Sequence, residues 1–87
     1  MKKVKVILNN ETGLHARPAS MFIKEASKYS SEIKVIKDEK EYNGKSIMGV
    51  LSMGAGKGSK LTIAAEGVDE NEAVKGLEKL IDSNFGE

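Results

Sequence analysis

The chain has 87 residues, of which 14 are lysine or arginine and 13 are aspartate or glutamate, so its formal net charge is +1. This balance argues against a protein built mainly to hold nucleic acid or an anionic membrane surface. The chain has no cysteine, which excludes disulfides, thiolate metal sites and cysteine nucleophiles, and its one histidine is His15. The length predicts a single domain, residues 1–87, with one small core.

Neither a membrane span nor a targeting segment is predicted. No apolar run approaches the roughly 18 residues of a membrane-spanning helix. Lys5 interrupts the apolar stretch that follows the basic N-terminus, so the pattern is not that of a signal peptide. We therefore expect a cytoplasmic protein without membrane insertion.

The first third of the chain predicts a strand, a loop and a helix. Alternating apolar residues indicate a strand over residues 3–8, and residues 9–15 form a loop. Pro18 suits the first turn of a helix, where its missing N–H has no intrahelical partner. The apolar residues that recur at helical spacing, and are expected to face the core, are Ala19, Phe22, Ile23, Ala26 and Tyr29.

The middle of the chain predicts a hairpin, followed later by a further strand. Residues 31–36 and 41–42 are the expected strands of the hairpin, and residues 37–40 are its polar turn. After a glycine-rich stretch, residues 60–66 alternate in the same way and predict a fourth strand.

Two further helices are predicted from their starting residues. Ser46 is an expected N-cap for a short helix over residues 47–53. Asp69, with Glu72 three residues later, resembles a capping box at the start of an amphipathic last helix that closes near Asn84. The order βαββαβα indicates an α+β fold, with helices on one face of a mostly antiparallel sheet.

The segment around His15 carries the residues most suited to chemistry. His15 lies where a loop enters a helix, and the first N–H groups of a helix attract anions. Arg17 adds a guanidinium whose forked donors suit a phosphate. The positive helix end also favours the neutral, nucleophilic imidazole, so this pattern indicates phosphoryl transfer through a phosphohistidine. A histidine beside a helix cap and a solvated arginine is the alternative interpretation.

The short helix predicted over residues 47–53 has two apolar stripes, of which a helix this short buries only one fully. We expect the other to be an exposed docking patch, because methionine and leucine adapt to different partners. The alternative is that Ile47 or Leu51 covers the edge of the core. One stripe holds Val50 and Met53, and the other holds Ile47, Met48 and Leu51. The basic residues expected to surround the patch are Arg17, Lys24 and Lys45.

Three other kinds of site are not predicted: a phosphate-binding loop, an RNA-recognition module and a metal site. Residues 54–59 are glycine-rich, but they lack the spacing of a phosphate-binding loop. The βαββαβ order also occurs in RNA-recognition modules, but their aromatic stacking strand is missing here. Asp38, Glu39 and Glu41 suit a solvated turn better than a metal site, so no metal is expected.

In this order and spacing, two segments resemble the motifs of one family. Residues 13–19 resemble the active-site motif of the histidine-containing phosphocarrier (HPr) family of the bacterial phosphoenolpyruvate-dependent sugar phosphotransferase system. Residues 45–50 resemble that family's regulatory serine segment, in the form found in low-GC Gram-positive bacteria. The similarity covers essentially the whole chain. It implies an α+β, HPr-like open-faced β-sandwich, with a four-stranded antiparallel sheet of order 1-4-2-3 covered on one face by three helices.

The resemblance implies a role for each matching residue. His15 would accept a phosphoryl group on Nδ1 from phosphorylated enzyme I and donate it to a sugar-specific enzyme IIA. Arg17 would neutralise the phosphoryl charge, and the backbone amides of Ala16 and Arg17 would receive it. Ser46 would be phosphorylated by an ATP-dependent HPr kinase/phosphorylase, which would impair transfer through His15 and favour binding to a catabolite-control repressor. The implied partner-binding residues are Ser20, Lys24, Ser27, Ile47, Met48 and Leu51.

The protein is thus expected to be a monomeric phosphoryl carrier in sugar transport and carbon catabolite repression. It would be a substrate of other enzymes rather than an enzyme, and it would need no cofactor. A related class keeps the serine but has lost the histidine, and the presence of His15 argues against that class. Two other hypotheses stay open: a purely regulatory binding protein of the same fold that acts through Ser46, and a small anion- or nucleic-acid-binding domain.

Overall fold

The computed structural model describes residues 1–86, so Glu87, the last residue of the expected domain, lies outside the described residues. The elements are β1 (Lys2–Ile7), α1 (Ala16–Ala26), β2 (Glu32–Lys37), β3 (Lys40–Asn43), α2 (Ile47–Ser52), β4 (Lys60–Glu66), α3 (Glu70–Asp82) and a short 3₁₀ turn, η1 (Asn84–Gly86).

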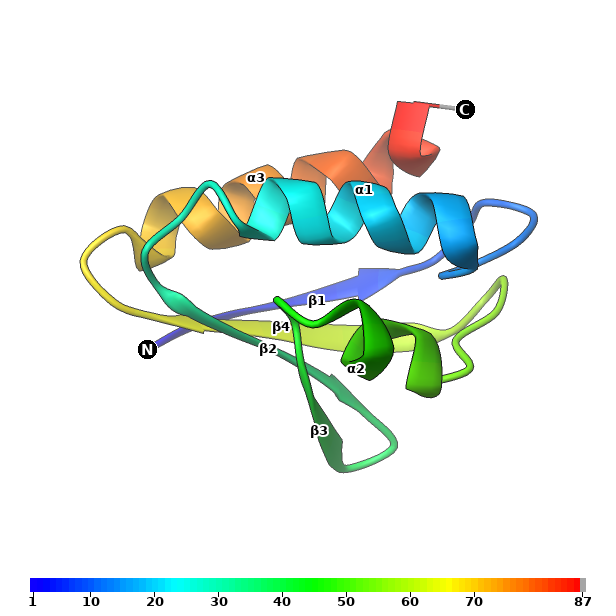
Figure 1. The fold of residues 1–87 in the computed structure, drawn as a ribbon, viewed down its shortest axis with the longest axis horizontal. Helices are drawn as coiled ribbons and strands as arrows, with labels where there is room; N and C mark the ends of the chain where they lie inside the picture. Colours follow the sequence, from blue (N-terminus) through cyan, green and yellow to red (C-terminus); the bar gives the residue numbers. More distant parts are fainter. Residues whose placement is uncertain (87) are drawn as a thin grey trace.

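The four strands form one antiparallel sheet in the order β1-β4-β2-β3. Helices α1 and α3 make a layer over one face of this sheet, and α2 packs against α1 beside β3 (Figure 1). The expected α+β open-faced sandwich and its strand order are therefore confirmed.

The register of the central strands places the core on the helix side of the sheet. Val35 of β2 lies opposite Ile63 of β4, and both are fully buried. On the other face, Lys5 of β1 lies opposite Thr62 and is exposed. This alternation arises because successive side chains of a strand point to opposite faces, so one face packs and the other meets water.

Helix α1 buries most of its predicted inner face. Ala19, Phe22 and Ala26 are fully buried, whereas Ile23 and Tyr29 are half-buried against the core. The helix ends at Ala26, so Tyr29 follows it in a turn. The Tyr29 hydroxyl donates a hydrogen bond to Glu25 Oε2 at 2.7 Å. This bond to a carboxylate, together with burial, raises the pKa of Tyr29 to about 12.

The β2–β3 hairpin has a shorter turn than the sequence predicts. Lys37 pairs with Lys40, so only Asp38 and Glu39 form the connection. Both have positive φ, 52° and 70°, as a two-residue type I′ turn requires. The twist of such a turn matches the twist of the strands, and β3 therefore begins one residue earlier than the predicted strand 41–42.

The predicted capping box at the start of α3 is wrong in its contacts, although Asp69 does occupy the N-cap position. Its carboxylate makes no bond to its own helix. It accepts hydrogen bonds from the Ser31 hydroxyl and from the backbone amides of Ser30 and Ser31, both at 2.9 Å. The Ser31 hydroxyl and then the Ser30 amide lower the pKa of Asp69 to about 2. Asp69 therefore connects the start of α3 to the turn before β2.

The Asp69 bonds predict acid-sensitive stability. Its folded-state pKa of about 2 lies below the ordinary 3.8, so its contribution is present above about pH 4 and is lost as the pH falls toward 2. Asp69→Asn should be less stable than the parent protein at pH 7, with the difference shrinking between pH 4 and pH 2. Chemical unfolding at several pH values measures this. Asp82→Asn removes an exposed carboxylate and controls for net charge; equal losses in both variants would contradict the prediction.

Candidate functional site

His15 is the N-cap residue of α1. Its backbone is extended, with φ −86° and ψ −173°, and its carbonyl oxygen accepts a 2.8 Å hydrogen bond from the amide of Ala19. Its side chain makes no capping bond and is exposed. The residue therefore starts the helix through its backbone, and the imidazole is left accessible to another molecule.

The first turn of α1 is open to an anion. The amides of Ala16 and Arg17 precede the first intrahelical bond, and Pro18 has no N–H. The first turn contains no acidic residue that would neutralise its partial positive charge. The Arg17 side chain is exposed beside it. As the sequence predicts, His15, Arg17 and two backbone amides lie together at one helix end.

The loop before His15 docks on the segment that follows α2. The amide of Leu14 donates to the carbonyl oxygen of Ala55 at 2.9 Å, and the Leu14 side chain is buried. Gly13 has φ +62°, and a Cβ there would lie 2.5 Å from Cα of Gly56 and closer still to the Ala55 oxygen. Glycine is required at residue 13 for both its backbone conformation and this close approach.

Asn10 is a residue of the site that the sequence analysis missed. Its side chain is 3% exposed, and its Nδ2 donates to the carbonyl oxygen of Gly13 at 2.8 Å. An asparagine three residues before a glycine is a recognisable turn signal, because its side chain bonds the nearby backbone. That signal identifies the turn, but not that the asparagine is buried.

Ser46 is the N-cap of α2, as predicted. Its Oγ accepts a hydrogen bond from the amide of Gly49 at 3.2 Å, and the residue is half-buried. Gly49 lies close to the preceding turn, since a Cβ there would lie 2.9 Å from the carbonyl oxygen of Asn43. The first turn of α2 carries no acidic residue either.

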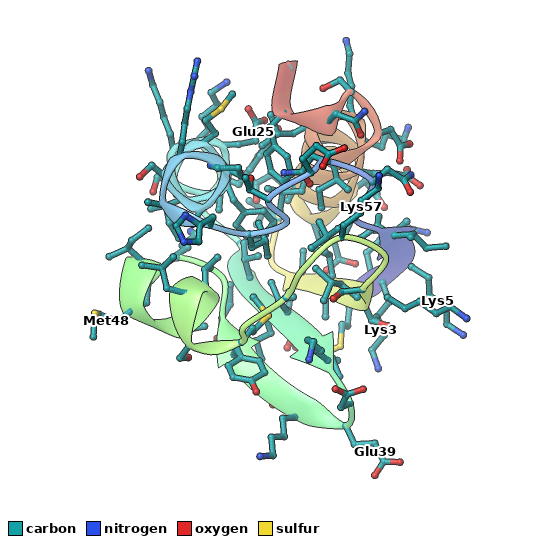
Figure 2. The ribbon with its side chains drawn as sticks, turned by 90° about the vertical axis from the view of Figure 1, so that its right-hand side faces the viewer. Lys3, Lys5, Glu25, Glu39, Met48 and Lys57 are labelled. Atoms are coloured by element: carbon teal, nitrogen blue, oxygen red, sulfur yellow. The ribbon has the colours of Figure 1, made fainter. Side chains whose placement is uncertain are left out.

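The two stripes of α2 are divided between core and surface. Val50 is fully buried and Met53 is 5% exposed. On the other stripe Met48 is 74% exposed, and Figure 2 shows it projecting away from the body of the protein. Ile47 and Leu51 are 38% and 40% exposed, and neither belongs to the half-buried residues packed against the core. The stripe is therefore exposed mainly at Met48, and Ile47 and Leu51 are each about two-fifths exposed, so the alternative that one of them covers the edge of the core stays open.

Helices α1 and α2 lie side by side, and each contributes exposed residues to the surface of the protein (Figures 1 and 2). Ser20, Lys24 and Ser27 are exposed at helical spacing on α1. We call the part of the surface contributed by α1 and α2 the α1–α2 face; its residues are His15, Arg17, Ser20, Lys24, Ser27, Ile47, Met48 and Leu51.

Lys45 does not act as a free cation beside this face, contrary to expectation. Its Nζ donates a 2.5 Å hydrogen bond to the carbonyl oxygen of Tyr29, and the residue is half-buried. Lys45 thus connects the segment before α2 to the chain just after α1. The exposed cations of the face are Arg17 and Lys24.

Two hollows of the surface lie away from His15. One of about 590 Å³ is lined by residues of β1 and β4, and one of about 530 Å³ by residues of β2 and β3. Within residues 1–86, no cluster of three or more histidine or acidic side chains could hold a metal ion, and no helix is long and apolar enough to cross a bilayer. His15 lines neither hollow.

The fold and the site define a class of protein: a small α+β sandwich that presents one exposed histidine at a helix start. The family model of the PTS HPr component phosphorylation site matches residues 2–83. The chain therefore belongs to the HPr family, the phosphocarriers of the sugar phosphotransferase system, which carry a phosphoryl group and are not themselves catalysts.

Sequence and structural similarity to named proteins supports this family assignment. The chain is 50% identical to the HPr-like protein Crh of Halalkalibacterium halodurans over 87% of its own length and 88% of that protein. It is 42% identical to the phosphocarrier protein HPr of Treponema pallidum, over 100% and 97% of the two chains. The crystal structure of HPr from Thermoanaerobacter tengcongensis superposes with a TM-score of 0.98 at 54% identity, covering 100% and 98% of the two chains.

Substitution of Gly13 should show how much the loop docking contributes. Gly54 has nearly the same φ, +61° against +62°, but a Cβ there meets nothing within 4 Å. Gly54→Ala should therefore cost only the left-handed backbone strain, about 1 kcal/mol. Gly13→Ala should cost at least about 1 kcal/mol more, because the loop must also move off residues 55–56. Urea unfolding of both variants measures the difference, and equal stability would contradict a tight contact.

Proposed function

We propose that His15 is the residue that accepts and donates the phosphoryl group. Its imidazole is exposed, makes no capping bond, and lies at a helix start with two open amides and an exposed arginine. That accessible nucleophile within an anion-binding helix end is the observation that carries the proposal. In this proposal the donor is phosphorylated enzyme I and the acceptor is a sugar-specific enzyme IIA.

The transfer is a displacement at phosphorus. The lone pair of His15 Nδ1 forms the new N–P bond while the bond between phosphorus and the donor atom of enzyme I breaks, leaving its electron pair on enzyme I. The guanidinium of Arg17 and the amides of Ala16 and Arg17 face the phosphoryl charge. A helix terminus stabilises a nearby charge by about 0.3–1 kcal/mol at an exposed position. This is enough to orient the phosphoryl group but too little to hold it against transfer. The second transfer, to enzyme IIA, therefore remains easy.

The α1–α2 face is the proposed docking surface for both partners. Donor and acceptor must each reach the same Nδ1, so they use overlapping surfaces and bind one at a time. The exposed Met48 supplies adaptable apolar contact, and Ile47 and Leu51 extend it. Arg17 and Lys24 lie at its edge, where charges mainly raise association rates toward acidic partners. Ser20 and Ser27 complete the face with small polar groups.

We further propose that Ser46 is a regulatory phosphorylation site. A phosphate on its Oγ would lie at the start of α2, where the helix end tolerates negative charge, and directly before the exposed Ile47 and Met48. The added charge, roughly −1.5 to −2, would oppose docking of enzyme I on the apolar patch. An HPr kinase/phosphorylase would add the group, and a catabolite-control repressor would bind the phosphorylated form.

A second candidate function is purely regulatory binding through Ser46, without carrier activity. The 50% identity to a Crh protein favours it, because Crh is named as HPr-like rather than as a phosphocarrier. The presence of His15 and Arg17 at an open helix end favours the carrier. We propose a monomer in either case.

Labelling separates the two functions. Incubation with phosphoenolpyruvate and enzyme I should give an acid-labile, base-stable phosphate on the protein, and His15→Ala should abolish it. The His15 side chain makes no capping bond, so this variant should keep the fold, as circular dichroism would verify. Ser46→Ala is the control and should keep the label. A label that persists in His15→Ala, or no label on the parent protein, would contradict the carrier proposal.

Charge at Ser46 should weaken docking. Aspartate is a good N-cap, so Ser46→Asp should preserve α2 while placing a negative charge beside the patch. Its affinity for enzyme I in titration calorimetry should fall by at least about fivefold, equivalent to about 1 kcal/mol. Ser46→Ala loses the cap without adding charge and should bind almost as well as the parent protein. Unchanged affinity of Ser46→Asp would count against this mechanism.

A further inference from the structure

Asn10 is one of two buried polar residues among residues 1–86, and the other is Ser31. The burial of Ser31 is explained by its bonds to Asp69. Asn10 lies in the loop between β1 and α1, five residues before His15, and is 3% exposed. A polar side chain buried in so short a loop needs a specific reason, because burial removes it from water.

The bonds of Asn10 close the turn before His15. Its Nδ2 donates to the carbonyl oxygen of Gly13 at 2.8 Å, and to Thr12 Oγ1 at a long 3.5 Å. The backbone carbonyl oxygen of Asn10 accepts a hydrogen bond from the amide of Gly13 at 3.2 Å. Side chain and backbone of Asn10 therefore bind both polar groups of Gly13. The Gly13 carbonyl is thereby held by a side chain of its own loop.

The same turn is held from the opposite side by the segment after α2. Gly13 lies against Ala55 and Gly56, and the Leu14 amide bonds the Ala55 carbonyl. The next residue is His15, whose carbonyl begins α1. Asn10 on one side and Ala55 on the other thus fix the two residues that immediately precede the histidine.

We propose that Asn10 is a positioning residue for phosphoryl transfer. It holds the Gly13 carbonyl, which sets the path of the chain into the N-cap of α1 and so the place of the His15 imidazole relative to the amides of Ala16 and Arg17. This rests on the proposed role of His15. Asn10 touches neither the phosphoryl group nor the partner, and it acts only through the turn.

Removal of the Asn10 side chain breaks its bond to the Gly13 carbonyl and leaves that buried carbonyl without this donor, which lowers stability. A positioning role predicts, in addition, a loss of transfer rate in protein that is still folded. Stability and transfer rate are therefore measured separately in Asn10→Ala.

The neighbouring asparagine supplies a matched control. Asn9 is exposed and makes no side-chain hydrogen bond among residues 1–86. The rate of phosphorylation by enzyme I, measured against carrier concentration, gives kcat and KM for the parent protein, Asn9→Ala and Asn10→Ala. Asn10→Ala should lower kcat by about tenfold, because a misplaced reacting group loses rate steeply. KM should stay the same, since the α1–α2 face is unaltered, and Asn9→Ala should match the parent protein.

Two further measurements separate a displaced active site from a general loss of stability. Amide ¹H–¹⁵N signals of Ala16 and Arg17 should shift in Asn10→Ala but not in Asn9→Ala, which a general loss of stability would not produce. Asn10→Asp keeps the side-chain shape but replaces the donor by an acceptor; it should lose rate as well, and it substitutes for Asn10→Ala if that variant does not fold. A labelled parent with unchanged kcat in the Asn10 variants would overturn only the positioning role. An unlabelled parent would overturn the carrier function and this proposal together.

Discussion

The carbonyl oxygen of Ala55 lies where a side chain at residue 13 would have to be, so only glycine lets the loop before α1 reach the segment after α2. The Leu14 amide bonds the same oxygen, and the next residue is His15. This contact joins parts of the chain about 40 residues apart, and the start of α1 depends on it. With Lys45 bound to the Tyr29 carbonyl, α1 and α2 are connected at both ends of their shared surface.

A carrier needs an exposed site. The His15 side chain can stay exposed because the hydrogen bond that starts α1 is made by the backbone of His15. His15 begins the helix through its carbonyl oxygen, while Asn10 and Ala55 hold the turn before it. Within residues 1–86 the imidazole therefore makes no hydrogen bond to the rest of the protein. In the same way Ser46 caps α2 beside an apolar stripe that the core leaves exposed. One small surface thus combines the proposed transfer residue, the proposed docking residues and the proposed regulatory residue.

Local patterns predicted the elements and most of the candidate site. Helical spacing separated the buried Val50 from the exposed Met48, and the chemistry of Pro18 and Ser46 located two helix starts. Apart from the length of the β2–β3 turn, the errors concern contacts between distant segments. Asp69 occupies the predicted N-cap position but bonds Ser30 and Ser31 instead of its own helix. Spacing along the chain carries no information about which distant amide a carboxylate will meet.

By itself the sequence determined the order of the elements, the apolar faces of the helices, and the placement of His15, Arg17 and Ser46 at helix starts, because these follow from interactions within a few residues. Only the tertiary structure decided the burial of Asn10, the bond of Lys45 to Tyr29, and the approach of Gly13 to Ala55. Each depends on how the sheet brings separate loops together. The strand order, which the family resemblance implied, is likewise a property of long-range pairing that periodicity does not encode.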